Sequence, residues 1–155
     1  MLYAKLNQNL LKRMLKKDRI AWAQNDHFIY ICNADSSACY RLVKKEEYFL
    51  KTPESGEVKA LSEKFGQRMA DLTRYIPADM EELTPTGMQF VDIIGKKKRI
   101  RAEYKTASDN ITYINPELLQ YFESKIMHLY KSVDSPEIYI FEYDICKGLV
   151  LSIKI

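Results

Sequence analysis

The chain has 155 residues, of which 46% are hydrophobic and 29% are charged, and its formal net charge is +3. This length fits one domain built around one core, so we expect a single domain over residues 1–155. A charge of this size does not by itself indicate a nucleic-acid partner, and no apolar run reaches the roughly 18 residues needed to cross a bilayer. The first residues also lack the compact apolar segment of a secretory signal. We therefore expect a cytoplasmic protein with no membrane partner.

Three cysteines occur, an odd number, and none of them forms a C-x-x-C motif. They are Cys32, Cys39 and Cys146, and the first two lie in runs that resemble strands. Reduced, partly buried thiols are favoured over a metal or redox role, because structural cysteines in the cytosol behave as small hydrophobic residues.

Near the N-terminus, residues 2–6 alternate like a short strand, and an amphipathic helix is predicted over residues 9–17. Asn7 or Asn9 would cap this helix, and Leu6, Leu10 and Met14 form its apolar stripe. The other face is basic. It carries Lys12, Arg13, Lys16 and Lys17.

The next segment predicts three consecutive strands, over residues 19–24, 28–33 and 38–44, separated by turn-rich residues and paired as a meander. Apolar residues then recur every three or four positions and predict a helix over residues 57–75, which Pro77 stops. Residues 78–85 are interpreted as a polar connector.

A β-hairpin is predicted next, over residues 88–94 and 99–106, with a turn at residues 95–97. A second basic run lies on this hairpin. Its members are Lys96, Lys97, Lys98, Arg99 and Arg101.

The last third begins with an extended ITYIN segment, in which Asn115 can cap a helix that has Pro116 at its first position. Apolar residues at helical spacing extend this predicted helix to Lys131, with Phe122 at the centre of its buried face. Two strands follow, IYIFEYD and GLVLSIKI. The expected class is α+β, with two helices packed on antiparallel sheets and a twofold strand–helix–strands repeat.

This order of elements resembles one domain of the bacterial DNA polymerase sliding clamp, best over residues 111–155. The likeness rests on Asn115, Pro116, Leu118 or Leu119, Ser135, Pro136, Gly148 and the terminal LVLSIKI, and less strongly on Asp35, Tyr40 and Arg41. In such a domain the helix at residues 57–75 is an insertion or a departure from the clamp pattern.

The resemblance implies a processivity factor of phage or mobile-element type whose helices face enclosed double-stranded DNA. Lys12, Arg13, Lys16 and Lys17 would then contact phosphates without sequence preference. Replication proteins would dock beside the last strands, at Leu149, Leu151, Ile153 and Ile155. Strand edges would join copies into a homo-oligomer. The alternatives are that the basic face is simply solvated and that the terminal apolar residues fill the core.

Motifs for nucleophilic hydrolysis, zinc-dependent proteolysis, phosphate cradling and dinucleotide binding are all missing from the sequence. His27 and His128 have no cysteine or carboxylate at a suggestive spacing. We therefore expect a non-enzymatic protein, with no cofactor and no metal, that binds DNA or replication proteins. The alternatives are a small structural or protein-interaction module without DNA binding, and an enzyme whose site residues are scattered along the chain.

Overall fold

The computed structural model describes residues 1–15, 20–24, 28–33, 37–43 and 76–154. These residues contain one α-helix, α1 (Tyr3–Leu15), one short 3-10 helix, η2 (Pro116–Leu119), and nine strands. The strands are β1 (Ile20–Gln24), β2 (Phe28–Asn33), β3 (Ala38–Val43), β4 (Met80–Ile94), β5 (Lys97–Lys105), β6 (Ile111–Ile114), β7 (Met127–Ser132), β8 (Glu137–Glu142) and β9 (Ile145–Leu151). The described part of the chain is therefore mostly β.

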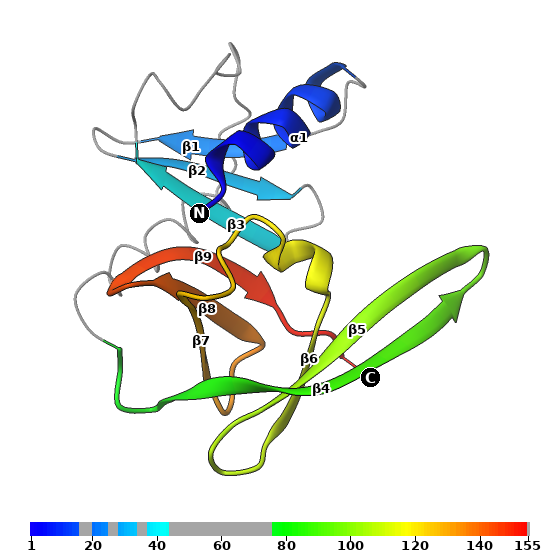
Figure 1. Cartoon of the computed structure of the whole chain (residues 1–155), viewed down its shortest axis with the longest axis vertical. Coiled ribbons are helices and arrows are strands. Elements are labelled where there is room, and N and C mark those ends of the chain that lie inside the picture. Colours follow the sequence, from blue (N-terminus) through cyan, green and yellow to red (C-terminus); the bar gives the residue numbers. More distant parts are fainter. Residues whose placement is uncertain (16–19, 25–27, 34–36, 44–75, 155) are drawn as a thin grey trace.

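All neighbouring strands are antiparallel, in the order β1-β2-β3-β9-β8-β7-β4-β5-β6. The predicted meander of the first three strands is confirmed. Its last member, β3, pairs with β9, so strands from the two ends of the chain lie side by side in the middle of the sheet (Figure 1).

Strand β4 belongs to two parts of the sheet. Its first residues, Met80 to Leu83, pair with β7, and from Thr84 onward it pairs with β5. The prediction of a polar connector over residues 78–85 is therefore wrong from Met80 onward, where these residues form β4. Alternation explains the strand, since Leu83 is buried while Glu82 and Thr84 are exposed.

The sheet also curls. After β9, the N–H of Ile153 donates to the carbonyl of Tyr113 at 2.8 Å, and Tyr113 lies in β6, at the far end of the strand order. The main core lies on one face, where Leu6 of α1 packs with side chains of β2, β3, β8 and β9. Helix α1 lies across the β1–β3 part of the sheet (Figure 1).

The N-terminal prediction was wrong in its first part. Residues 3–6 belong to helix α1 and not to a strand, so Asn7 and Asn9 lie inside the helix and do not cap it. The apolar period of Leu6 and Leu10 extends back to Tyr3, and all three belong to the main core or pack against it. The three- and four-residue spacing of these apolar side chains therefore favours a helix over a strand at the N-terminus.

The prediction of a helix from Pro116 to Lys131 was also wrong beyond its first turn. Asn115 does cap it, because its Oδ1 accepts the N–H of Glu117 at 3.0 Å, but the helix ends at Leu119. Residues from Met127 form β7, which pairs with β4 on one side and with β8 on the other. A helix there would leave the backbone groups of both neighbours unpaired.

The fold class is corrected accordingly. The described residues contain a single α-helix on an antiparallel sheet, and neither the pair of packed helices nor the twofold strand–helix–strands repeat of a clamp domain is present in them. The helix predicted over residues 57–75 lies outside the described residues.

Candidate functional site

A long β-hairpin projects from the body of the molecule (Figure 1). Strands β4 and β5 pair in register from Gln89 opposite Ala102 to Ile94 opposite Lys97. The turn at Gly95 and Lys96 has a φ of +61° at Gly95, as a type II′ hairpin turn requires at its first central residue. We call residues 88–101 the arm. Within the described structure, the arm is a two-stranded ribbon, because β6 pairs with β5 only from Ala102 onward.

On one face of the arm, Arg101 packs between the aromatic rings of Phe90 and Tyr113. The Arg101 guanidinium carbon lies 4.6 Å from the ring centroids of both Phe90 and Tyr113, which is cation–π distance. Its Nε donates to Asp92 Oδ1 at 3.2 Å, and Arg99 Nη2 donates to Asp92 Oδ2 at 3.1 Å. Since Tyr113 belongs to β6, these contacts join the base of the arm to the body.

The electrostatics of this face follow from the two arginines. The hydrogen bond from Arg99 lowers the pKa of Asp92 more than partial burial raises it, and Arg101 lowers it further. Nearer the body, Tyr113 donates its hydroxyl to Glu103 Oε2 at 3.1 Å, and Thr86 Oγ1 donates to the Glu103 carbonyl at 3.2 Å. The base is thus held by polar contacts from both β4 and β6.

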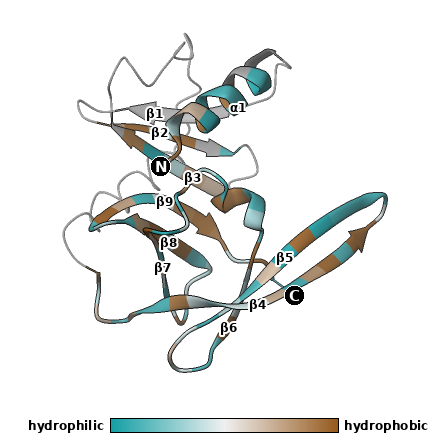
Figure 2. Ribbon diagram, viewed as in Figure 1, coloured by the Kyte–Doolittle hydropathy of each residue, from teal (hydrophilic) through white to brown (hydrophobic). Residues whose placement is uncertain are grey.

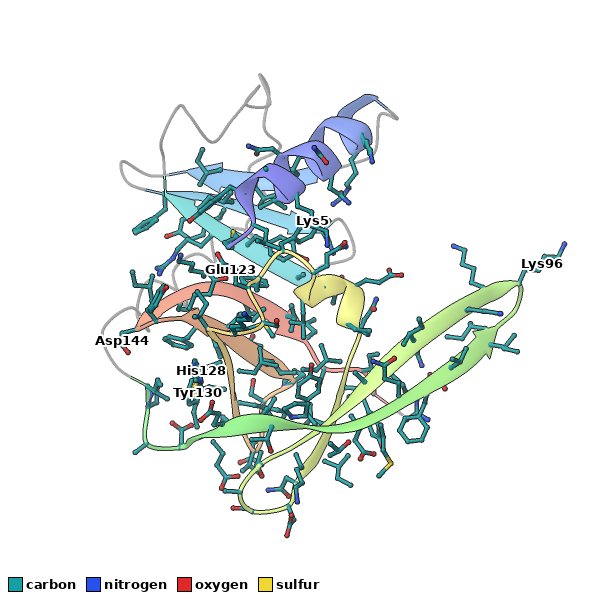
Figure 3. The ribbon with its side chains drawn as sticks, in the orientation of Figure 1. Lys5, Lys96, Glu123, His128, Tyr130 and Asp144 are labelled. Carbon is teal, nitrogen blue, oxygen red and sulfur yellow. The ribbon has the colours of Figure 1, made fainter. Side chains whose placement is uncertain are left out.

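The arm is one of the strongly basic segments of the chain. It has five basic residues and one acidic residue, Asp92, so its net charge is +4 in a chain of total charge +3, and the rest of the chain carries −1. Lys96, Lys97 and Lys98 are exposed at the tip, where Figure 3 shows Lys96 pointing away from the body. The charge is therefore concentrated on the part of the molecule that reaches furthest out.

Exposed apolar side chains accompany these charges. Met88, Val91, Ile93, Ile94 and Ile100 are all at least 38% exposed, and Ile93 reaches 75%. Figure 2 shows the apolar stretch along β4 beside the hydrophilic stretch of β5.

The basic residues predicted on the first helix are only partly brought together. Lys12 is exposed on α1, whereas Arg13 is half-buried and its Nη1 donates to Asn33 Oδ1 at 3.0 Å. Arg13 also lines a cavity of about 150 Å³ between α1, β2 and the η2 turn. Lys16 and Lys17 lie outside the described residues.

The predicted partner pocket at the C-terminal strand is mostly interior. Leu149 is fully buried in a cluster with Tyr30 and Cys146, while Leu151 and Ile153 are half-buried. Ile155 lies outside the described residues. The alternative interpretation, that these side chains fill the core, thus describes Leu149.

Within the described residues, the other reactive groups do not form a recognisable catalytic arrangement. His128 Nδ1 lies 2.6 Å from Glu82 Oε1, as an exposed pair on β7 and β4. Burial raises the pKa of the Cys146 thiol to about 12, so this thiol stays protonated. Among the described residues, no group of three or more potential metal ligands gathers, and no helix is long and apolar enough to span a membrane.

Sequence reasoning noted the basic run at residues 96–101 but did not place the site there. The signal that could have found it is the position of the run, at the turn of a predicted hairpin.

No known protein family, curated protein or solved structure matches the chain. The site is therefore argued from its own geometry.

Proposed function

We propose that this protein binds double-stranded DNA without sequence preference, through the arm. The observation that carries the proposal is the placement of a net charge of +4 on a projecting two-stranded ribbon, in a chain of total charge +3. A polyanion is the natural partner for such a surface, because neutralising phosphates releases condensed counterions.

The shape of the arm supports the same partner. A two-stranded β-ribbon fits a groove of duplex DNA, and the lysines at its turn can reach the phosphates on either side. The rings around Arg101 and its contact with Asp92 hold the ribbon base in a defined position. Binding would then need little ordering of the backbone, which lowers its entropic cost.

This proposal differs from the mechanism that the clamp resemblance implied. The segment expected to supply a second DNA-facing helix forms β7, and Arg13 of the first helix contacts Asn33. The phosphate contacts are therefore assigned to Lys96, Lys97 and Lys98, with Lys12 as an additional surface charge.

Fluorescence anisotropy with a labelled duplex of arbitrary sequence, titrated over a series of salt concentrations, tests the proposal. Each phosphate contact adds about 0.9 to the slope of log Kd against log salt. Changing Lys96, Lys97 and Lys98 together to alanine should weaken binding on every duplex and reduce the slope by about 2 to 3.

The matched control changes Lys5, Lys125 and Lys154 to alanine. These three lysines are also exposed but lie off the arm, so both triple variants have the same net charge. The control should keep most of the affinity. Equal loss in the two variants would show that only overall charge matters, and no binding by the wild-type protein up to about 100 µM at low salt would reject the function.

The competing proposal is a protein-interaction module, which the exposed apolar side chains of the arm favour. It predicts no affinity for duplex DNA at any salt concentration. The same titration therefore decides between the two functions.

A further inference from the structure

The apolar side chains at the tip of the arm have no role in phosphate contact. Ile93 and Ile94 are 75% and 55% exposed, and they directly precede the turn at Gly95 and Lys96. Successive residues of a strand point to opposite faces, so one isoleucine lies on each face of the ribbon. The tip is therefore apolar on both faces and flanked by lysines.

Alternation continues this pattern along the arm. Val91 and Ile100 are paired across the ribbon and share a face with Ile93, whereas Phe90, Asp92 and the two arginines occupy the other face. On that second face, Phe90 and Arg101 contact one another and Tyr113. Only at the tip do both faces lack such internal contacts in the described structure.

The charge of the arm argues against a second copy of this chain as the occupant. Two arms packed tip to tip would bring together two ribbons that each carry +4. Like charges at an interface cost binding free energy. A polyanionic partner gains from the same charges, so it is the better match.

An anionic membrane would also attract the lysines. However, the aromatic residues of the arm region, Phe90 and Tyr113, pack around Arg101 at the base and do not lie at the tip. Trp and Tyr are enriched where protein segments meet the membrane–water interface. Duplex DNA is therefore favoured over lipid.

We propose that Ile93 and Ile94 insert between base pairs and bend the bound duplex, while the neighbouring lysines hold the phosphates. Apolar side chains that enter a base step unstack it and kink DNA by roughly 20–90°. This inference rests on the proposed DNA binding and adds to it a defined deformation.

Two readouts separate the inference from the function on which it rests. Anisotropy reports binding, and energy transfer between dyes at the two ends of a duplex of about 30 base pairs reports bending. At saturating protein, the wild type should raise energy transfer. Changing Ile93 and Ile94 together to alanine should abolish most of that rise while Kd changes by less than about fivefold and the salt slope stays the same.

The matched control changes Val91 and Ile100 to alanine. These residues are exposed and apolar on the same ribbon but lie further from the turn, so this variant should still bend DNA. Circular dichroism should show that both variants fold, since the substituted side chains are exposed.

Each other outcome overturns the inference. Binding by the wild type without any rise in energy transfer rejects bending but leaves DNA binding intact. Unchanged bending by the Ile93 and Ile94 variant, or equal loss in both variants, rejects insertion by the two isoleucines and also leaves DNA binding intact. Absence of binding rejects the function as well. Sedimentation with vesicles of phosphatidylserine and phosphatidylcholine, without duplex binding, assigns the tip to lipid instead.

Discussion

At the scale of single residues, Glu142 shows how the interior constrains the fold. Its carboxylate is fully buried, and it accepts hydrogen bonds from the Met1 amino group and from the N–H of Glu123, the latter at 3.0 Å. The Nζ atom of Lys147 lies 3.2 Å from Oε2 of Glu142. Burial raises the pKa of Glu142, but these partners together outweigh it, so the pKa is lowered overall.

A pH dependence of stability follows. Because the folded-state pKa of Glu142 is below its ordinary value of about 4.3, its contribution is complete above that pH and is lost as the pH falls through the folded-state value. Changing Glu142 to Gln should cost about 3 kcal/mol at pH 7, since it leaves the buried amino group with only the half-exposed carboxylate of Glu123, 3.8 Å away, as a counter-charge. Urea unfolding at a series of pH values measures this. A difference between wild type and variant that stays constant down to pH 3 would contradict it.

Gly148 is required for a different reason, the close approach of an aromatic ring. A Cβ at this position would lie 2.6 Å from Cζ of Phe122 and 3.3 Å from Cδ1 of Ile140. Gly148→Ala should therefore destabilise the protein by about 1 to 3 kcal/mol through overpacking.

A double-mutant cycle checks the cause of this loss. Phe122→Leu removes the ring atom that the new methyl group meets, so Gly148→Ala should cost clearly less in that background. Equal costs in the two backgrounds would show that backbone effects, and not the ring, explain the need for glycine.

Phe122 itself was predicted as a core residue, and it is 5% exposed, which confirms the prediction. The reason given for it was wrong, however. Phe122 follows η2 and packs on Tyr40, with 5.9 Å between the ring centroids, whereas the prediction placed it at the centre of a long helix. Its size and apolar character favour burial in either structure.

At the scale of elements, a single carboxylate opposes the five positive charges of the arm. Asp92 is the only acidic residue among residues 88–101, and it contacts Arg99 and Arg101. If the arm binds DNA, Asp92→Asn should increase duplex affinity about two- to tenfold and steepen the salt slope, because one repulsive charge is removed. The free energy of unfolding should change little, because Asp92 and its arginine partners are partly exposed to solvent.

Asp109→Asn is the control for this experiment. Asp109 is an exposed carboxylate off the arm, 81% exposed and 3.2 Å from Lys105, so its substitution changes net charge equally. It should affect affinity much less. A fall in affinity for Asp92→Asn would mean that orienting the two arginines matters more than the repulsion.

The elements also differ in how readily they could be predicted. The strands at residues 20–24, 28–33 and 38–43 and the hairpin turn at Gly95 were predicted because alternation and turn residues are local signals. Residues 116–131 carry apolar positions that suit a helix or a strand. Pairing with β4 and β8 decided between the two, and the sequence alone does not reveal that pairing.

At the scale of the whole molecule, the proposed function depends on the position of the basic arm. A ribbon with a net charge of +4 projects from the rest of the described structure. This arrangement would help to orient a polyanion toward the arm before contact, because clustered charges of one sign steer an oppositely charged partner.

By itself, the sequence determined the local features of this protein: the early strands, the hairpin with its basic turn, the Asn115 cap and the burial of residues such as Leu6 and Phe122. These depend on side-chain chemistry and on contacts between near neighbours. Only the tertiary structure decided that β9 pairs with β3, that residues 127–132 form a strand and that the basic hairpin stands free of the body. The physical reason is that strand pairing joins segments far apart in the chain, and its hydrogen bonds are made by backbone groups that every residue shares.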